Sequence, residues 1–388
     1  MNPLRDKPFR VLVNTIALTA PLTGIGRYTL ETCRRLGNYR DLDLTFFYGY
    51  FSRNLADGNK QDSVPGAMTG SRKLLASFPS VKKIGRRGLM ALASLDRSHH
   101  EIYWEPNLVP LPQLLKKADR AVATIHDFSW YHHPEWHPKE RLDFFNSYFF
   151  KGVERCDHLI TGSEYTKNEI IDIMGVKEEK ITVIHHGVDH EIYKEYPQQQ
   201  CRDFAIKKGL PEKFILFVGT LEPRKNLEKL LKAYDTLPGP LKRGYKLVIA
   251  GGKGWNDEDL RKAMTGMKKD VHLTGYVPDK ELPLLYNLAS LFVYPSLYEG
   301  FGIPPIEAMA CGCPVLTSHT TAMPEVCGNA ALYCDPLDPD SIRQGLVSIL
   351  ENNSFAHELK IRAISKAKEY CWNYSAKAHS KVLLDLTN

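Results

Sequence analysis

The sequence predicts an α/β protein with two domains of similar architecture, each built on a parallel β-sheet, that face each other across a cleft. The chain has 388 residues, which is long for one hydrophobic core and typical of two domains. Apolar runs with the length of buried strands alternate with helical patterns throughout the chain. The same alternation restarts near residue 213, after a polar stretch at 193–202 that contains Pro197 and three glutamines.

The individual elements follow from these patterns. In the first half we expect strands at 10–16, 42–48, 102–104, 121–125, 157–161 and 181–185, and helices at 25–36, 139–155 and 164–174. In the second half we expect strands at 213–219, 246–250, 271–275, 291–294 and 314–317, a helix at 226–234, and a helical tail at 341–383 in which a break at 372–375 begins a last helix. The stretch 193–202 is the expected linker, with domains at 1–195 and 196–370.

Composition excludes several classes of protein. Hydrophobic residues make up 43% of the chain and charged residues 25%, as in globular proteins that are not embedded in membranes. There is no apolar run of about 18 residues, and the amino terminus has no apolar signal core, so a cytoplasmic protein is expected. The eight cysteines lie in apolar contexts without paired metal spacing, and we expect them to be reduced packing residues.

Positive charge is concentrated in one segment. Residues 51–100 contain nine Lys and Arg against three Asp, an excess equal to the net charge of +6 for the whole chain. Within 71–95, six basic residues and no acidic residue are interleaved with apolar side chains. Such a basic amphipathic stretch is typical of a surface that binds anionic lipid, and a solvated loop is the alternative. Nucleic acid is a weaker candidate partner, because no aromatic-rich reading motif accompanies the charge.

The most informative stretch is 299–312, where Glu299 and Glu307 stand eight positions apart. The apolar run 291–295 predicts a strand, and Pro304–Pro305 fits the first turn of a helix. Glu299 is therefore expected in the loop after the strand, and Glu307 in the first turn of the helix. Ligands of open α/β sheets bind at this edge, where two carboxylates can hold sugar hydroxyls. The alternative is that Glu307 only complements the helix dipole and Glu299 is a solvated loop acid.

A second motif combines two cations with a helix start. Residues 217–226 predict a strand, a turn that carries Arg224 and Lys225, and the beginning of a helix. Helix amino termini attract anions, and the two cations would hold a diphosphate and neutralise it as it leaves. A solvated turn is the alternative.

Two further positions follow strands of the first half. Gly24 and Gly26 lie where a helix begins, and a backbone without Cβ atoms can approach a ligand phosphate there. The dinucleotide fingerprint is incomplete, and a purely structural turn is the alternative. His126 ends another strand, where a histidine can donate a hydrogen bond or move a proton, although with fourteen histidines any one of them can be structural. No histidine or cysteine spacing predicts a metal site.

Together these segments resemble the retaining family-4 glycosyltransferases of the GT-B fold, and among them the O-antigen mannosyltransferases. The resemblance rests on the E-x7-E spacing and on four segments: Val-Gly-Thr-Leu-Glu-Pro-Arg-Lys-Asn at 218–226, Gly-Tyr-Val at 275–277, Pro-Ser-Leu-Tyr-Glu-Gly-Phe-Gly at 295–302, and Leu-Tyr-Cys-Asp-Pro-Leu-Asp-Pro at 332–339. It covers almost the whole chain and is weakest at 50–100.

The resemblance implies two Rossmann-like domains, an amino-terminal one for the acceptor and a carboxyl-terminal one for the nucleotide sugar, with a last helix at 371–388 crossing back. Glu299 would contact the donor sugar, Glu307 the ribose, and Lys225 with Arg224 the diphosphate. His126 would contact the donor sugar and orient the transfer. The expected catalytic residues are thus His126, Arg224, Lys225 and Glu299. The expected nucleotide-sugar contacts are Gly24, Gly26, Gly219, Thr220, Arg224, Lys225, Tyr276, Val277, Glu299, Gly300, Phe301, Gly302, Ile303 and Glu307, with the backbone of Tyr276 and Val277 bordering the base.

One departure from the family pattern stands out. Many relatives carry Arg directly after the glycine equivalent to Gly219, where this chain has Thr220. Whether Arg224 replaces that cation is open at this point.

The resemblance also implies the reaction. It implies retention without a metal or cofactor, and, because no second carboxylate is marked as a nucleophile, a front-face route rather than a double displacement. GDP-mannose is the expected donor, with UDP- and dTDP-sugars as alternatives, and the expected acceptor is a lipid-linked or lipopolysaccharide glycan. A peripheral position on the inner face of the cell membrane fits that acceptor. An inactive sugar-nucleotide-binding protein and a phosphorylase-like or α-glucan synthase enzyme are the other hypotheses.

Overall fold

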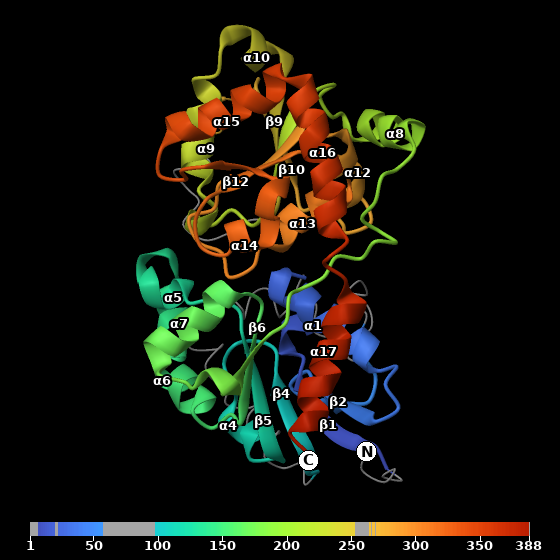
Figure 1. Ribbon diagram of the computed structural model, residues 1–388, viewed down its shortest axis with the longest axis vertical. Helices are drawn as coiled ribbons and strands as arrows, with labels where there is room; N and C mark the ends of the chain where they lie inside the picture. Colours follow the sequence, from blue (N-terminus) through green and yellow to red (C-terminus); the bar gives the residue numbers. More distant parts are fainter. Residues whose placement is uncertain are drawn as a thin grey trace, which may run out of the picture.

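The computed structural model describes residues 7–19, 22–56, 98–252, 264, 266–267 and 269–387. The chain forms two α/β halves stacked along the long axis of the molecule (Figure 1). A seven-stranded sheet of order β3-β2-β1-β4-β5-β6-β7 forms the amino-terminal half, and a six-stranded sheet of order β10-β9-β8-β11-β12-β13 forms the carboxyl-terminal half. Neighbouring strands are parallel except β2 and β3.

The strands of the amino-terminal half, and the helices between them, lie between Phe9 and Val183. Its strands are β1 (Phe9–Asn14), β2 (Leu42–Phe47), β3 (Phe51–Ser52), β4 (His100–Glu105), β5 (Ala118–Ile125), β6 (His158–Thr161) and β7 (Ile181–Val183). Its helices are η1 (Ile16–Thr19), α1 (Gly24–Leu36), α4 (Pro112–Leu115), α5 (Ser129–His132), η2 (Pro134–Trp136), α6 (Lys139–Val153), α7 (Glu164–Met174) and η3 (Glu178–Lys180).

The carboxyl-terminal half repeats the alternation. Its strands are β8 (Phe214–Val218), β9 (Lys246–Ala250), β10 (Val271–Gly275), β11 (Leu291–Tyr294), β12 (Val315–Ser318) and β13 (Leu332–Cys334). Its helices are α8 (Gln198–Lys208), η4 (Pro223–Lys225), α9 (Leu227–Asp235), α10 (Gly239–Gly244), α12 (Leu282–Leu288), α13 (Ile303–Ala310), α14 (Met323–Cys327), η5 (Gly328–Ala330), α15 (Pro339–Glu351) and α16 (Asn353–Ala367). The last helix of the chain is α17 (Trp372–Asp385).

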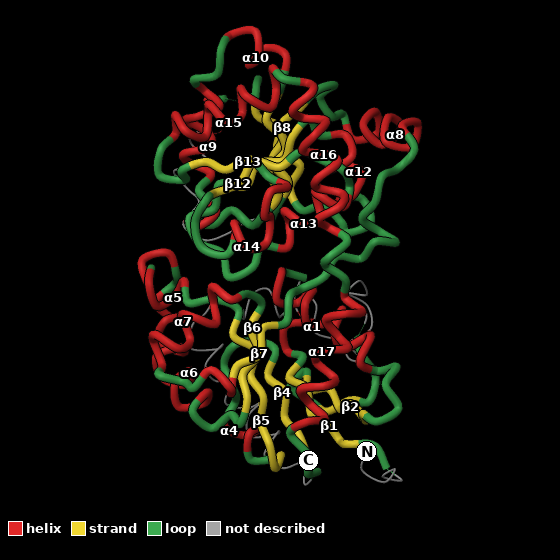
Figure 2. Tube along the Cα trace, in the orientation of Figure 1, coloured by secondary structure: helices red, strands yellow, loops and turns green. Residues whose placement is uncertain are grey.

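The central strands are uninterrupted apolar runs because both faces of each sheet are covered. In β8, Phe214, Ile215, Leu216 and Phe217 are completely buried, and helices flank the strands of each half on both sides (Figure 2). A parallel sheet covered on both faces requires such a run rather than alternating polar residues. Strand order reverses between β1 and β4 and again between β8 and β11. Ligand sites of doubly wound sheets lie at these switch points, outside the carboxyl ends of the strands.

The chain passes between the halves twice. The first passage follows β7, the second precedes α17, and the two meet in a parallel bridge between Val188 and Cys371. They approach so closely that a Cβ atom on Gly187 would lie 2.2 Å from the backbone nitrogen of Trp372. Only glycine fits at such a close backbone contact.

The last helix, α17, returns to the amino-terminal half, where the carboxyl terminus lies (Figure 1). There it packs against α1. The Nε2 atom of His379 lies 2.6 Å from the hydroxyl of Tyr28, and Arg35 donates to Asn373 at 2.9 Å. Leu383 is completely buried. The amino-terminal core is thus completed by the last residues of the chain.

Most of the predicted elements are present, and two expectations are wrong. The predicted linker at 193–202 contains the start of α8, because glutamines favour helix once Pro197 has ended the extended segment. Helix α13 begins at Ile303, so Glu307 is its fifth residue and lies in the second turn, not the first. The short elements β3, β13, α4, α5, α10, α12 and α14 and the 3-10 helices were not predicted.

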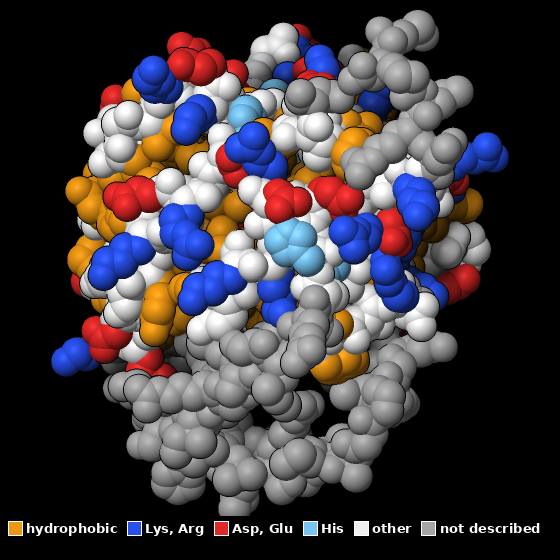
Figure 3. Space-filling view, turned by 90° about the horizontal axis from the view of Figure 1, so that it is seen from below, with side chains coloured by type: hydrophobic (Ala, Val, Ile, Leu, Met, Phe, Trp, Pro, Cys, Tyr) orange, Lys and Arg blue, Asp and Glu red, His pale blue; other side chains and the backbone are white. Residues whose placement is uncertain are grey.

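None of the described helices combines the length and apolar character that a membrane span requires. The basic segment 71–95 lies outside the described residues. On the described part of the outer face of the amino-terminal half, Lys and Arg are interspersed with Asp and Glu (Figure 3). All eight cysteines are free, and seven are buried, as expected for packing residues.

Candidate functional site

The predicted site residues of both halves meet where the loop after β11 faces the end of β5. A Cβ atom on Gly300 would lie 1.8 Å from the backbone oxygen of His126, so the two loops are in direct backbone contact. The carbonyl oxygen of Gly300 accepts hydrogen bonds from Ser163 Oγ at 2.6 Å and Thr166 Oγ1 at 3.3 Å. Gly302 then adopts φ +89° as the residue before α13, a conformation suited to glycine.

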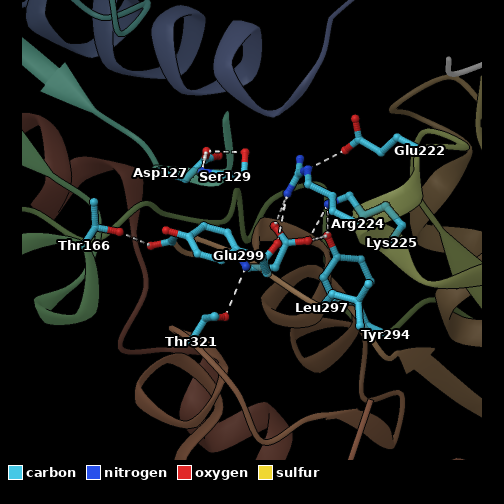
Figure 4. Close-up of polar contacts among 12 residues, drawn as sticks. Asp127, Ser129, Thr166, Glu222, Arg224, Lys225, Tyr294, Leu297, Glu299 and Thr321 are labelled. Carbon is cyan, nitrogen blue, oxygen red and sulfur yellow. Dashed lines mark hydrogen bonds and ion pairs between the residues drawn. The ribbon is translucent and has the colours of Figure 1, made fainter. Parts of the chain in front are cut away.

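Glu299 lies at the centre of an ion-pair cluster (Figure 4). Its Oε1 atom is 2.6 Å from Lys225 Nζ, and its Oε2 atom is 2.9 Å from an Arg224 guanidinium nitrogen. The Tyr294 hydroxyl donates to Oε1 at 2.9 Å, and the Glu299 backbone N–H donates to Thr321 Oγ1 at 3.1 Å. The carboxylate is thus fixed between two cations.

The turn that presents the two cations is fastened by the residue that follows them. Asn226 has φ +60°, a left-handed conformation that asparagine tolerates, and ends the short helix η4. Its side-chain amide donates to the carbonyl oxygens of Pro295 and Pro336 at 2.9 and 2.7 Å. The cations therefore follow β8 on a turn that is tied to the loop after β11.

Charges in this cluster are balanced. Burial would raise the pKa of Glu299, but Arg224 and Lys225 outweigh burial and hold its pKa below the ordinary value, so the carboxylate is ionised. Arg224 also pairs with Glu222, whose Oε1 atom lies 2.7 Å from the guanidinium Nε. Arg224 and Lys225 are thus paired with Glu299 and Glu222, and an incoming diphosphate would compete with these two carboxylates for the two cations.

Glu307 forms a second cluster, which sequence reasoning did not find in full. Its Oε1 atom is 2.5 Å from a guanidinium nitrogen of Arg27, and its Oε2 atom accepts from the Tyr286 hydroxyl at 3.2 Å. Arg27 belongs to α1 in the other half, and it also contacts Asp279 and Tyr193. Burial raises the pKa of Glu307, which Arg27 counteracts. The sequence signal was the position of Arg27, directly after Gly26.

His126 is held in one tautomer. Its Nε2 atom lies 2.7 Å from the carbonyl oxygen of Pro106, which can only accept, so Nε2 carries the proton. Burial lowers the pKa of His126, so the ring is neutral at pH 7 and Nδ1 is an acceptor. The next residue, Asp127, accepts from Ser129, and its pKa is lowered below the ordinary value because Arg224 and Ser129 outweigh the effect of burial.

The remaining predicted contacts are arranged around these clusters. Gly219 and Thr220 directly follow β8, and Gly26 is buried in the first turn of α1, whereas Gly24 is exposed and a Cβ atom there would meet nothing within 4 Å. Tyr276 and Val277 line a cavity of about 210 Å³ beside β10, α8 and α12. Phe301 and Ile303 are buried. The side chain of Phe301 packs on His186 and Tyr370, so its contribution is to support the loop.

Within the described part of the chain, no group of three His, Cys, Asp or Glu side chains is placed to hold a metal ion.

Comparison with known proteins identifies the family of this chain. Residues 22–192 match the family model "Glycosyltransferase Family 4", and residues 200–368 match "Glycosyl transferases group 1". The O-antigen chain mannosyltransferase B of Escherichia coli is 33% identical over 372 residues, which cover 94% of this chain and 96% of that protein. The O-antigen chain mannosyltransferase RfbU of Salmonella typhimurium is 32% identical over 58% of this chain and 60% of its own length.

Solved structures confirm the GT-B fold expected from the sequence. The complex of Anabaena HepE with UDP-glucose superposes with a TM-score of 0.70 at 16% identity, covering 97% of this chain and all of that chain. WaaG, a glycosyltransferase involved in lipopolysaccharide biosynthesis, superposes with a TM-score of 0.68 at 15% identity, covering 96% and 99% of the two chains.

Proposed function

Because the chain belongs to the family-4 glycosyltransferases, we propose that it transfers mannose from GDP-mannose to a lipid-linked or lipopolysaccharide glycan, with retention of the anomeric configuration. The observation that carries the proposal is the ionised Glu299 held between Arg224 and Lys225, next to Gly300, which lies against the backbone of His126. The choice of mannose rests on the O-antigen mannosyltransferases that the chain resembles along its length.

The cluster suits the departure of a nucleoside diphosphate. Lys225 and Arg224 neutralise charge as the bond between the anomeric carbon and the diphosphate oxygen breaks. The acceptor hydroxyl attacks the same face and gives its proton to the departing phosphate oxygen. Glu299 holds hydroxyls of the donor sugar, and the Nδ1 atom of His126 accepts from another. In this scheme the side-chain cations take the place of a metal ion.

Glu307 is proposed to bind the ribose hydroxyls, and the backbone of Tyr276 and Val277 to border the base beside the cavity that they line. Gly26, Gly219 and Thr220 would be approached by the diphosphate.

A panel of nucleotides tests the donor. Thermal unfolding is measured with GDP, UDP and dTDP and with their sugars. At 100 times the dissociation constant, a ligand stabilises the protein by about 2.7 kcal/mol, which separates the donors. A shift with GDP and GDP-mannose supports the proposal, whereas a shift only with UDP or dTDP compounds assigns another donor. Absence of any shift contradicts a nucleotide-sugar enzyme.

Product analysis tests the reaction. Incubation with GDP-mannose and extracted lipid-linked glycan, followed by NMR of the product, is expected to give an α-mannosyl linkage with and without EDTA. A β-linkage would contradict retention, and loss of turnover in EDTA would contradict a metal-independent reaction. Donor binding without transfer or hydrolysis would favour an inactive sugar-nucleotide-binding protein.

The proposed membrane contact rests on the sequence of 71–95. Reversal of Lys82, Lys83, Arg86 and Arg87 to Glu is expected to release the protein from anionic liposomes, since each basic residue contributes about 1 kcal/mol near such a surface. GDP binding should be retained, because the proposed nucleotide contacts lie elsewhere. If wild-type protein does not bind anionic liposomes at low salt, the proposed membrane contact is wrong.

A further inference from the structure

Arg27 occupies a position that local helix energetics do not explain. It is the fourth residue of α1, close to the positive end of the helix dipole, where a cation is disfavoured. Its side chain is nevertheless mostly buried, with 17% exposed, and it extends to the other half of the molecule. There it pairs with Glu307 and Asp279 and lies against Tyr193, whose ring centre is 5.6 Å from the guanidinium carbon. The reason for this cation therefore lies in the other half of the molecule.

The cations near the two glutamates already have partners. Arg27 pairs with two carboxylates, Glu307 and Asp279, while Arg224 and Lys225 pair with Glu299 and Glu222. Arg141, a further cation beside the Arg224 cluster, interacts electrostatically with Asp127 and Glu222. Moreover, Arg224 directs its Nε to Glu222 and another nitrogen to Glu299 and to the carbonyl oxygen of Tyr298 at 3.3 Å. Arg224 is thus held on several sides, and Thr220 adds no charge. A diphosphate that enters this site needs another cation that can change partners.

We propose that Arg27 is that cation: when the nucleoside diphosphate binds, its guanidinium moves from Glu307 to the diphosphate, and the ribose hydroxyls take its place on Glu307. This inference rests on the proposed function. In a nucleoside diphosphate, a single methylene group joins the diphosphate to the ribose. If Glu307 binds the ribose, the guanidinium of Arg27 on Glu307 can reach the diphosphate by rotation of its side chain. Gly26, the proposed backbone neighbour of the diphosphate, immediately precedes Arg27. The planar fork of arginine suits two phosphate oxygens.

The test compares ligands that differ only in the diphosphate. Calorimetry measures the affinities of GDP and guanosine for wild-type protein and for Arg27→Gln. We expect GDP to bind about tenfold more weakly or worse, because a charge-assisted hydrogen bond is lost. Guanosine should bind equally well or more tightly, because Glu307 is released. Arg34→Gln is the matched control, since Arg34 lies on the same helix, pairs with Glu31 and is 46% exposed, and it should change neither affinity.

Equal or tighter GDP binding by Arg27→Gln would overturn the inference and make Arg27 a competitor of the ribose only. If the variant loses guanosine as well, NMR of the arginine Nε–H groups in wild-type protein decides, with Arg27→Lys used to assign the Arg27 signal. A shift of that signal with GDP but not with guanosine supports the inference, and an unchanged signal overturns it. If wild-type protein binds none of GDP, UDP and dTDP, the proposed function itself fails.

Discussion

Neutralising Glu299 should make the protein bind the free nucleotide better and catalyse worse. In the structure, Glu299 accepts hydrogen bonds from Lys225 at 2.6 Å and from Arg224 at 2.9 Å, and it is 5% exposed. Glu299→Gln leaves both cations buried without this counter-charge, which costs about 3–5 kcal/mol of stability when one partner of a buried pair is removed. A bound diphosphate restores the missing negative charge.

The expected size follows from the contacts that are exchanged. One charge-assisted hydrogen bond contributes about 1.5–3 kcal/mol, so at the low end GDP should bind Glu299→Gln about tenfold more tightly than it binds wild type. Transfer should fall by about a hundredfold or more, because the sugar loses the carboxylate aimed at its developing positive charge. Calorimetry with GDP and initial rates with GDP-mannose measure the two effects.

Glu222→Gln is the control for charge alone. Glu222 pairs with Arg224 at 2.7 Å on the side away from Glu299 (Figure 4), so GDP should again bind more tightly while transfer is largely retained. The thermal shift produced by GDP should also be larger in Glu299→Gln than in wild type. Weaker GDP binding by Glu299→Gln would refute the idea that this carboxylate competes with the diphosphate.

Four further perturbations separate the roles of individual residues. Lys225→Met should weaken GDP binding about tenfold or more in calorimetry, because its charge is lost, and unchanged affinity would contradict the diphosphate assignment. Glu307→Gln should raise the KM for GDP-mannose more than it lowers kcat, since the ribose changes little during transfer, and the reverse pattern in steady-state kinetics would contradict ribose binding. Gly300→Ala should lower transfer while GDP still binds, because its Cβ would lie 1.8 Å from the His126 carbonyl oxygen of the other half, and normal turnover would show that this contact is dispensable. Burial lowers the pKa of His379 to about 4, so between pH 4 and about 6.5 the unfolded chain binds a proton that the folded protein does not, and stability rises with pH. In urea unfolding, wild type should therefore lose about 1.6 kcal/mol more than His379→Gln between pH 6.5 and 5, and equal losses would contradict a buried neutral ring.

The sequence was informative where the residues of a site are contiguous in the chain. The strand, turn and helix around Arg224 and Lys225 are adjacent in the chain, so the pattern alone predicted the two cations. The same holds for Glu299, whose loop lies between β11 and α13. The pairing of the two cations with Glu299 and the bonds of Asn226 to Pro295 and Pro336 depend on the fold. Short elements such as β13 gave no pattern, because three residues are too few to establish a period.

The rest of the site depends on contacts between distant parts of the chain. Arg27 and Glu307 are 280 positions apart and belong to different halves, so no local pattern indicates that they pair. In the sequence, nothing distinguishes Gly300 from the other glycines of its loop. Only the structure shows that it contacts the backbone of His126. The tautomer of His126 likewise follows from the carbonyl of Pro106, which only the fold brings to its ring.

The return of α17 to the amino-terminal half has a consequence for how the protein is made. During translation, the first sheet leaves the ribosome long before Trp372, His379 and Leu383, which cover Tyr28 and the rest of α1. In the nascent amino-terminal half, this face of α1 therefore remains uncovered while about half of the chain is still being synthesised. A fragment that ends before α17 would carry the same exposed face permanently. For this enzyme, a helix that is synthesised after both sheets covers the half that emerges first.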